Sequence, residues 1–168
     1  ISDHLSLHDV LRATAEQIAA HVPTGAVAVF LADDARATLS VAEAIGLPDA
    51  LREMTLPADA GVARAVAHRA RPLRLAFDHD TPCPFPGVPA RSGLAVALRK
   101  GDTHHGIIVV VSQESDAYAE GDATFLAALG AQAAAAIENA LLYEDANRRA
   151  EEAATLYELS QAISSSLQ

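Results

Sequence analysis

The last third of the chain most constrains what the chain can fold into. From about Glu120 to Gln168 there is no proline, and no glycine follows Gly130. Ala, Leu, Glu and Gln dominate this stretch, and all four favour the helix. A single helix here would hold about 45 residues and run about 70 Å at about 1.5 Å per residue. A helix of that length must extend beyond any small domain on which it packs.

Two parts of this expected helix carry different patterns. The apolar residues of the first part can pack on a sheet: Phe125, Leu129, Ala133, Ala136, Ile137 and Leu141. A helical stripe continues in the second part: Leu142, Ala146, Arg149, Ala153, Leu156, Leu159, Ile163 and Leu167. We expect this stripe to pair with a second copy and form a homodimer. Asp145, Arg149 and Glu152 interrupt this stripe with charged side chains. Polar residues in the seam make a coiled coil less stable, as a two-state linker would need. A solvated single helix would show the same pattern.

Hydrophobic spacing predicts the elements that precede this helix. Spacing of three and four residues predicts helices over 6–22 and 60–70, and a short helix or turn is expected over 49–54. Short apolar or alternating runs predict strands over 26–31, 38–45, 73–75, 92–99 and 106–112. The last of these strands is apolar on both faces, which indicates a central strand covered by helices on each side. Residues 77–91 hold four prolines and a glycine, so no regular element can continue through them.

Composition and charge disfavour several classes of function. The chain has 12 Lys and Arg against 22 Asp and Glu, a net charge of −10, so it lacks the basic surface that nucleic acids require. The only cysteine, Cys83, cannot form an internal disulfide, which favours the cytoplasm. No apolar run approaches the roughly 20 residues that span a bilayer, and we expect no membrane contact in this piece. The start at Ile1 and the helical pattern at Gln168 suggest that the piece is cut from a longer protein.

The order of the expected elements is helix, two strands, short helix, strand, irregular segment, two strands and long helix. With this order the chain resembles the GAF family of small sensory domains, from residue 5 to about residue 145. The most specific runs are 92–98, 106–111, 118–122, and 126–132 with 136–140. The last pair is similar to the exit-helix motif of the family. Where the family often places Ser or Thr before that helix, this chain has Ala119, and Asp122 can compensate through the helix dipole.

The resemblance implies an α+β fold with an antiparallel sheet of about five or six strands, helices packed on it, a ligand cavity over the sheet and a long C-terminal helix. It implies a sensory domain over residues 1–145 and a signalling linker helix over 146–168 that leads to a further domain. The whole would belong to a bacterial signal-transduction protein, such as the histidine kinase of a two-component system, a diguanylate cyclase or a phosphatase. This piece would be regulatory rather than enzymatic.

The two ends of the chain resemble each other. Residues 163–167 match residues 1–5 at the Ile, Ser and Leu positions, 162 residues apart. This separation suits one repeat of a tandem pair of sensory domains. A shared amphipathic helix pattern would explain the match equally well.

The proline-rich stretch over 77–91 lies where GAF domains usually wall their ligand cavity. Apolar walls could come from Phe77, Phe85 and Val88, polar contacts from Asp78, Arg91 and Ser92, and a thiol from Cys83. Prolines would stiffen such a wall. Alternatively, Phe85 and Val88 plug the cavity and complete a core that binds nothing.

The sequence identifies no cofactor. Bilin-binding relatives usually have His after the attachment cysteine, whereas Cys83 lies between two prolines with no adjacent base. Relatives that reduce methionine sulfoxide need several cysteines, which this chain lacks. The neighbouring residues of Asp78–Asp80 and of His104–His105 would point to opposite sides of an extended chain, unlike metal ligands. The Asn-Lys-Phe-Asp-Glu run of cyclic-nucleotide binders is absent, which leaves a cyclic nucleotide only a weak candidate, and a haem on a single axial His stays open.

Two functional hypotheses follow from these patterns. In the first, a small molecule in the cavity shifts the packing of the loop and strands, and the exit helix passes the change to an output domain. In the second, the domain binds nothing and serves as a dimerisation and spacing module. No set of residues supports an enzymatic reading.

Overall fold

The computed structural model describes residues 6–167. Its helices are α1 (Leu7–His21), α2 (Gly61–Val66) and α3 (Glu120–Ser166), with a 3₁₀ turn η1 at Asp49–Leu51. Its strands are β1 (Ala26–Ala32), β2 (Thr38–Ile45), β3 (Thr55–Pro57), β4 (Leu73–Ala76), β5 (Ser92–Lys100) and β6 (Thr103–Ser112). The match between residues 1–5 and 163–167 involves residues outside this described range.

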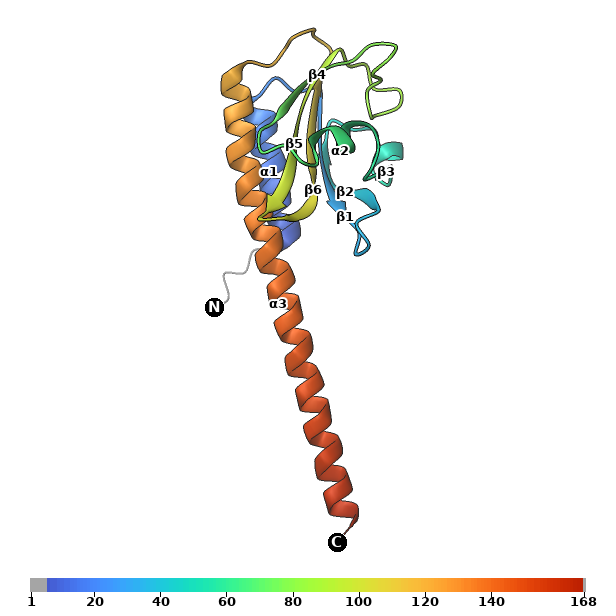
Figure 1. Cartoon of the computed structure of the whole chain (residues 1–168), viewed down its shortest axis with the longest axis vertical. Coiled ribbons are helices and arrows are strands. Elements are labelled where there is room, and N and C mark those ends of the chain that lie inside the picture. Colours follow the sequence, from blue (N-terminus) through green and yellow to red (C-terminus); the bar gives the residue numbers. More distant parts are fainter. Residues whose placement is uncertain (1–5, 168) are drawn as a thin grey trace.

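The six strands form one antiparallel sheet in the order β3-β2-β1-β6-β5-β4. Helices α1 and α3 lie side by side and antiparallel on one face, while α2 and the loop that follows β4 lie on the other (Figure 1). This arrangement confirms the expected α+β fold, with an antiparallel sheet of about five or six strands and a long C-terminal helix; the sheet has six strands within residues 6–167. It also separates a helical face from a loop-covered face, on which the candidate site lies.

Strand β6 is central and buried on both sides, as its sequence predicts. Ile108 and Val110 belong to the core beneath α1 and α3, whereas Ile107, Val109 and Val111 belong to the core beneath α2. Helices on each side were expected, but this is correct for one face only. The other face has a single six-residue helix and is otherwise covered by irregular chain, because residues 77–91 cannot form a helix.

Three local predictions differ from the structure. Strand β3 was not predicted, because three residues are too few for a periodic pattern; it forms by pairing with Thr38–Ser40. The expected helix over 60–70 ends at Val66, since the exposed residues 68–70 bury no apolar face. Strand β6 begins at Thr103 rather than Gly106, because a bulge shifts the register between Leu98 and Arg99 of β5.

Gly106 lets the two central strands approach closely. A Cβ atom at this position would lie 1.9 Å from the carbonyl oxygen of Phe30 on β1. No side chain can occupy that space, so only glycine permits this register next to the bulge.

Helix α3 begins with a partial cap and then changes surroundings along its length. The Asp122 side chain accepts a hydrogen bond from the backbone N–H of Ala119 at 2.9 Å, so it contributes more than the expected dipole effect. The residues buried in the domain are Ala123, Leu126, Leu129, Gly130, Ala133, Ala134 and Ile137. The expectation that Leu141 packs on the sheet is wrong, because the helix has left the sheet there and the side chain is 45% exposed.

Within the described part of the chain, α3 is the one helix whose length and apolar composition would allow it to cross a membrane. This finding qualifies the expectation from the sequence that no apolar run comes near that length. Much of the hydropathy comes from alanines such as Ala133 and Ala134, which pack closely in the core instead.

Candidate functional site

A cavity of about 370 Å³ lies on the loop-covered face of the sheet. It is bounded by β3, the first turn of α2, β4 and the segment just after β4. Its walls are mostly apolar and come from Leu56, Pro57, Ala60, Gly61, Val62, Ala65, Leu75, Asp80, Thr81, Pro82, Cys83 and Pro84. The volume falls within the range of about 300–1,000 Å³ that small-molecule pockets usually have.

Of the seven ligand residues predicted from the sequence, only Cys83 lines this cavity. Phe85 is instead buried in the core, 1% exposed, and its ring stacks on that of Phe30 with centroids 6.1 Å apart and planes 7° apart. Val88 packs half-buried against the same cluster. These two residues therefore fill the sheet face beside the cavity, and the cavity itself stays open.

The remaining four predicted residues have structural contacts. Phe77 packs over Gly93, where an added Cβ would lie 2.7 Å from the ring. The Asp78 carboxylate accepts hydrogen bonds from the backbone N–H groups of Asp80 and Thr81, each at 2.9 Å, and so holds a turn. Arg91 is exposed, and its backbone pairs with the backbones of Phe77 and Ser112. The buried Ser92 hydroxyl donates to the Glu114 carbonyl at 2.6 Å and accepts from the Ala117 N–H.

The sequence analysis missed most of the cavity wall. Leu56 lies in β3, Ala60 directly precedes α2 and Ala65 lies within α2, so all three are outside the proline-rich stretch. Small and aliphatic residues carry no chemical signal of a site. Only their gathering in space identifies the cavity.

A family model described as the GAF domain matches residues 6–139. The chain belongs to the GAF domain family. This match covers the sheet, both packed helices and the part of α3 that the sheet buries. No curated protein matches the chain.

Solved structures from several bacteria share the GAF fold. The GAF domain of a phosphoenolpyruvate-protein phosphotransferase from Coxiella burnetii has a TM-score of 0.74 and 21% identity, over 85% of this chain and 89% of that one. The GAF domain of a two-component sensor histidine kinase from Bacillus halodurans has a TM-score of 0.70 and 16% identity, over 84% and 99%. A free methionine-R-sulfoxide reductase from Neisseria meningitidis has a TM-score of 0.70 and 19% identity, over 84% and 83%. At these identities the likeness shows the fold alone.

The thiol of this GAF domain is poorly suited to act as a nucleophile. Cys83 is half-buried, and burial raises the pKa of its thiol, although the Phe85 N–H lies 3.5 Å from its sulfur. A raised pKa keeps the thiol protonated at neutral pH and therefore less reactive. Within residues 6–167 no group of three or more His, Cys, Asp or Glu side chains is placed to hold a metal ion.

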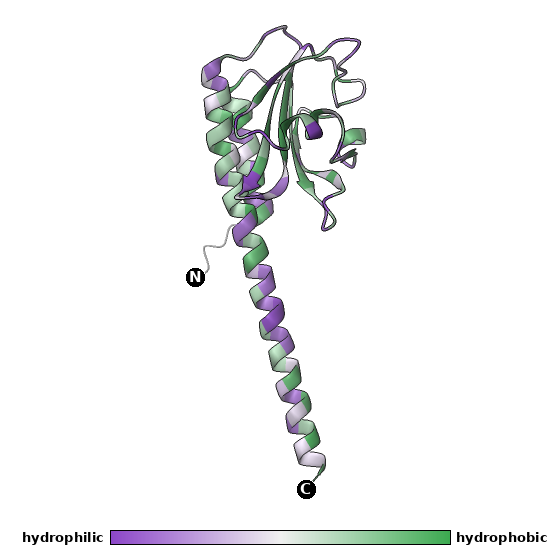
Figure 2. Cartoon of the chain, viewed as in Figure 1, coloured by the Kyte–Doolittle hydropathy of each residue, from purple (hydrophilic) through white to green (hydrophobic). Residues whose placement is uncertain are grey.

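The residues predicted to form the dimer helix lie on the part of α3 that extends from the GAF domain. Leu142, Leu156, Leu159 and Ile163 are 55–67% exposed, and apolar and polar residues alternate along this part (Figure 2). Arg149 makes an ion pair with Asp145 at 3.1 Å along the helix. These four apolar side chains are therefore solvent-exposed in the single chain.

A partly buried contact between a histidine and a glutamate marks the point where α3 leaves the GAF domain. His105 is the extra residue of the bulge in β6, and its Nε2 lies 2.8 Å from the Glu138 carboxylate on α3. His105 is 3% exposed and Glu138 is 32% exposed at the side chain. His104 precedes His105 in β6 and lies opposite Arg99 of β5. The sequence analysis missed this pair, since nothing local to either residue reveals a partner 33 positions away.

Proposed function

We propose that this GAF domain is the regulatory sensory domain of a multidomain signal-transduction protein. It binds a small molecule in the apolar cavity, and a dimerising α3 passes the change to an output domain. The cavity itself carries this proposal, because its lining strand β4 is in direct contact with the first turn of α3. Cytoplasmic location and an output domain such as a histidine kinase are part of the same proposal.

The route from cavity to helix passes through neighbouring residues of β4. Leu75 lines the cavity, whereas Arg74 donates to the Tyr118 carbonyl at 3.2 Å and pairs with Glu120, the first residue of α3, at 3.1 Å. Arg71 pairs with the same carboxylate at 2.8 Å. Exposed ion pairs of this kind contribute little stability, so a shift of β4 can rearrange them at low cost. Ligand binding would thus bias the position of α3 where it enters the domain.

The exposed stripe of α3 supports the dimer. Successive steps of four and three residues place these side chains on one seam: Leu142, Ala146, Arg149, Ala153, Leu156, Ser160, Ile163 and Leu167. Such 4-3 spacing is the pattern of a coiled coil, and its polar members Arg149 and Ser160 reduce its stability. Leu159, which the sequence analysis placed in the stripe, lies beside this seam. A marginal helix pair is what a two-state linker requires.

A second candidate function rests on a specific contact. Because the stacked rings of Phe85 and Phe30 already fill the centre of the loop-covered face, the domain could serve as a ligand-free dimerisation and spacing module. Reductase activity is not proposed, since one half-buried thiol has no resolving partner in this sequence. Incubation with free methionine-R-sulfoxide should leave the substrate unreduced, and turnover with a thiol reductant would contradict this.

Native mass spectrometry and thermal shift across a metabolite panel test the ligand proposal. The expected result is a co-purifying or added small molecule that raises the melting temperature of the native chain. Ala65→Phe, an exposed position that lines the cavity, should abolish the shift, whereas Arg64→Phe on the same helix should keep it. An empty mass with no shift from any compound would sink the proposal and leave the spacer function.

Light scattering tests the dimer. The full chain should be a dimer at high micromolar concentration, and a chain that stops at Asn147 should be a monomer. Leu156→Glu in the seam should produce a monomer, whereas Tyr157→Glu beside it should leave the dimer intact. If the full chain is a monomer, helix pairing fails for this chain.

A further inference from the structure

A second cavity lies at the open edge of β5, away from the apolar one. Strand β4 pairs only with Ser92–Ala95, so β5 has no strand neighbour on that side beyond Ala95. A space of about 400 Å³ fills this gap between the segment after α2, the edge of β5 and helix α3. Its lining includes His68 and Arg69 after α2, Arg99 on β5, and Ala127, Gly130 and Ala131 on α3.

The charged and titratable side chains of this lining are all basic. Among residues 6–167, neither Arg69 nor Arg99 forms an ion pair, although the whole chain has a net charge of −10. The Nη1 of Arg99 donates to the Ala67 carbonyl at 2.8 Å, which holds the guanidinium beside the segment after α2. Asp102 follows Gly101 in the turn but is exposed and pairs with neither arginine. The cavity therefore holds uncompensated positive charge.

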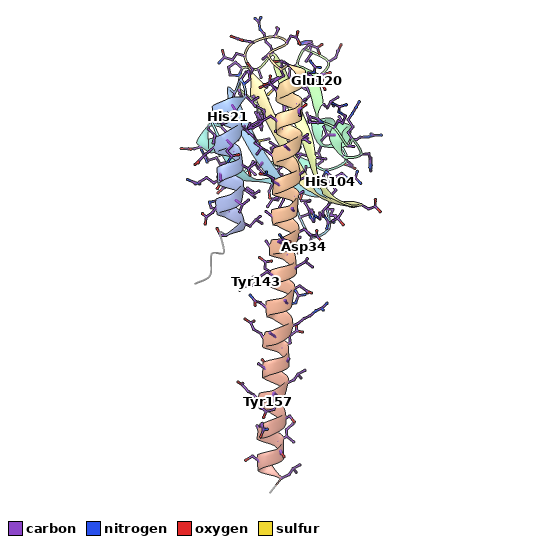
Figure 3. The ribbon with its side chains drawn as sticks, turned by 90° about the vertical axis from the view of Figure 1, so that its left-hand side faces the viewer. His21, Asp34, His104, Glu120, Tyr143 and Tyr157 are labelled. Atoms are coloured by element: carbon purple, nitrogen blue, oxygen red, sulfur yellow. The ribbon has the colours of Figure 1, made fainter. Side chains whose placement is uncertain are left out.

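His104 lies next to Arg99, at the edge of this basic group. It pairs with Arg99 across the β5–β6 ladder, and its Nε2 is buried without a hydrogen-bond partner. Burial lowers the pKa of His104, and electrostatic repulsion from nearby basic side chains, Arg99 first and then Arg36, lowers it further. Arg36 donates to the His104 carbonyl from the opposite hairpin. Figure 3 labels His104 at the end of the sheet from which α3 continues outward.

The helical wall of the cavity is made of small residues. Ala127, Gly130 and Ala131 face it from α3, and a Cβ at Gly130 would lie 3.2 Å from Val96. This wall offers apolar contact but no hydrogen-bonding side chain. A ligand that fits would therefore place an anionic group at the arginines and a short aliphatic body against α3.

We propose that this edge cavity binds a small organic anion, with a carboxylate or phosphate group held by Arg69 and Arg99 and a short aliphatic part against Ala127 and Ala131. The site is separate from the apolar cavity. Because its walls come from both β5 and α3, occupancy would hold the helix against the sheet edge. The site would then add a second input to the regulation proposed above.

NMR amide shifts and calorimetry on the full chain test this site. The probes are butyrate, n-propyl phosphate and inorganic phosphate, each titrated at constant ionic strength with chloride as the reference anion. We expect saturable shifts at Arg99, Gly101 and Ala131 with at least one probe. The butyrate and phosphate titrations separate a carboxylate from a phosphate ligand, and shifts at Leu75 would instead report the apolar cavity.

Matched variants decide the assignment. Arg69→Gln removes a charge that makes no hydrogen bond in the described structure, and Ala131→Asp places a carboxylate at the exposed edge of the cavity. Each should weaken binding by about tenfold or more, whereas Arg64→Gln, an equal charge change on α2 outside the cavity, should alter it by less than about twofold. The proposal is overturned by the absence of saturable shifts, or by an equal loss in Arg64→Gln. Melting temperatures near that of the native chain show that the variants fold.

Discussion

Removing the ring of Phe85 would show whether this residue is an essential part of the core. Phe85 lies in a loop with prolines on either side, yet it is 1% exposed and stacked on Phe30. If the loop is a fixed cover of the sheet, Phe85→Ala must destabilise the whole domain. If the loop is loosely attached, the substitution will change little.

The size of the effect follows from two contributions. Burying a phenylalanine side chain stabilises a protein by about 2 kcal/mol. A stacked aromatic pair adds about 1 kcal/mol. The sum of about 3 kcal/mol is at the lower end of measured Phe→Ala costs, which fits a loop that can partly close over the space.

Urea unfolding followed by circular dichroism measures this loss directly. For a chain of this size, about 3 kcal/mol corresponds to a fall of about 9 °C in melting temperature. Phe85→Leu keeps most of the apolar volume and should cost only about 1 kcal/mol. A loss below about 1 kcal/mol for Phe85→Ala would refute the assignment of Phe85 to the core.

Three further predictions concern the sheet and its contacts. Gly106→Ala should cost at least about 2 kcal/mol in urea unfolding, because its Cβ would overlap the Phe30 carbonyl; a smaller loss would mean that the strands can separate. Glu138→Leu should cost about 2 kcal/mol by leaving the buried His105 without its partner, whereas Glu144→Leu on the exposed helix should change stability by less than about 0.5 kcal/mol; equal effects would contradict the buried pair. Folding lowers the pKa of His104, so the unfolded chain binds a proton more readily than the folded chain does. The free energy of unfolding therefore decreases as pH falls through the ordinary pKa of 6.5. His104→Gln should therefore lose less stability than the native chain between about pH 7 and about pH 5 in urea titrations, and parallel curves would refute this.

Elements with strong local patterns were predictable from the sequence. Helix α3 follows from composition, because Ala, Leu and Glu favour a helix without help from other segments. The hairpin of β5 and β6 follows from apolar runs around Lys100–Asp102. These patterns with their order were enough to suggest the family. Strand β3 and the bulge at His105 were not predictable from the sequence, because both depend on pairing with another strand.

The candidate sites, too, were predictable from the sequence only in part. The proline-rich stretch could be recognised as a cover of the sheet, but which residue points into space and which into the core is a tertiary result, as Cys83 and Phe85 show. The basic edge cavity depends on β4 being shorter than β5 and on small residues of α3 facing the gap. The sequence by itself thus determined the order of the elements other than β3, the long exposed helix and the overall negative charge, since each is a local or summed property. Only the tertiary structure decided where cavities remain and which charges stand without partners, because these depend on contacts between residues far apart in the chain.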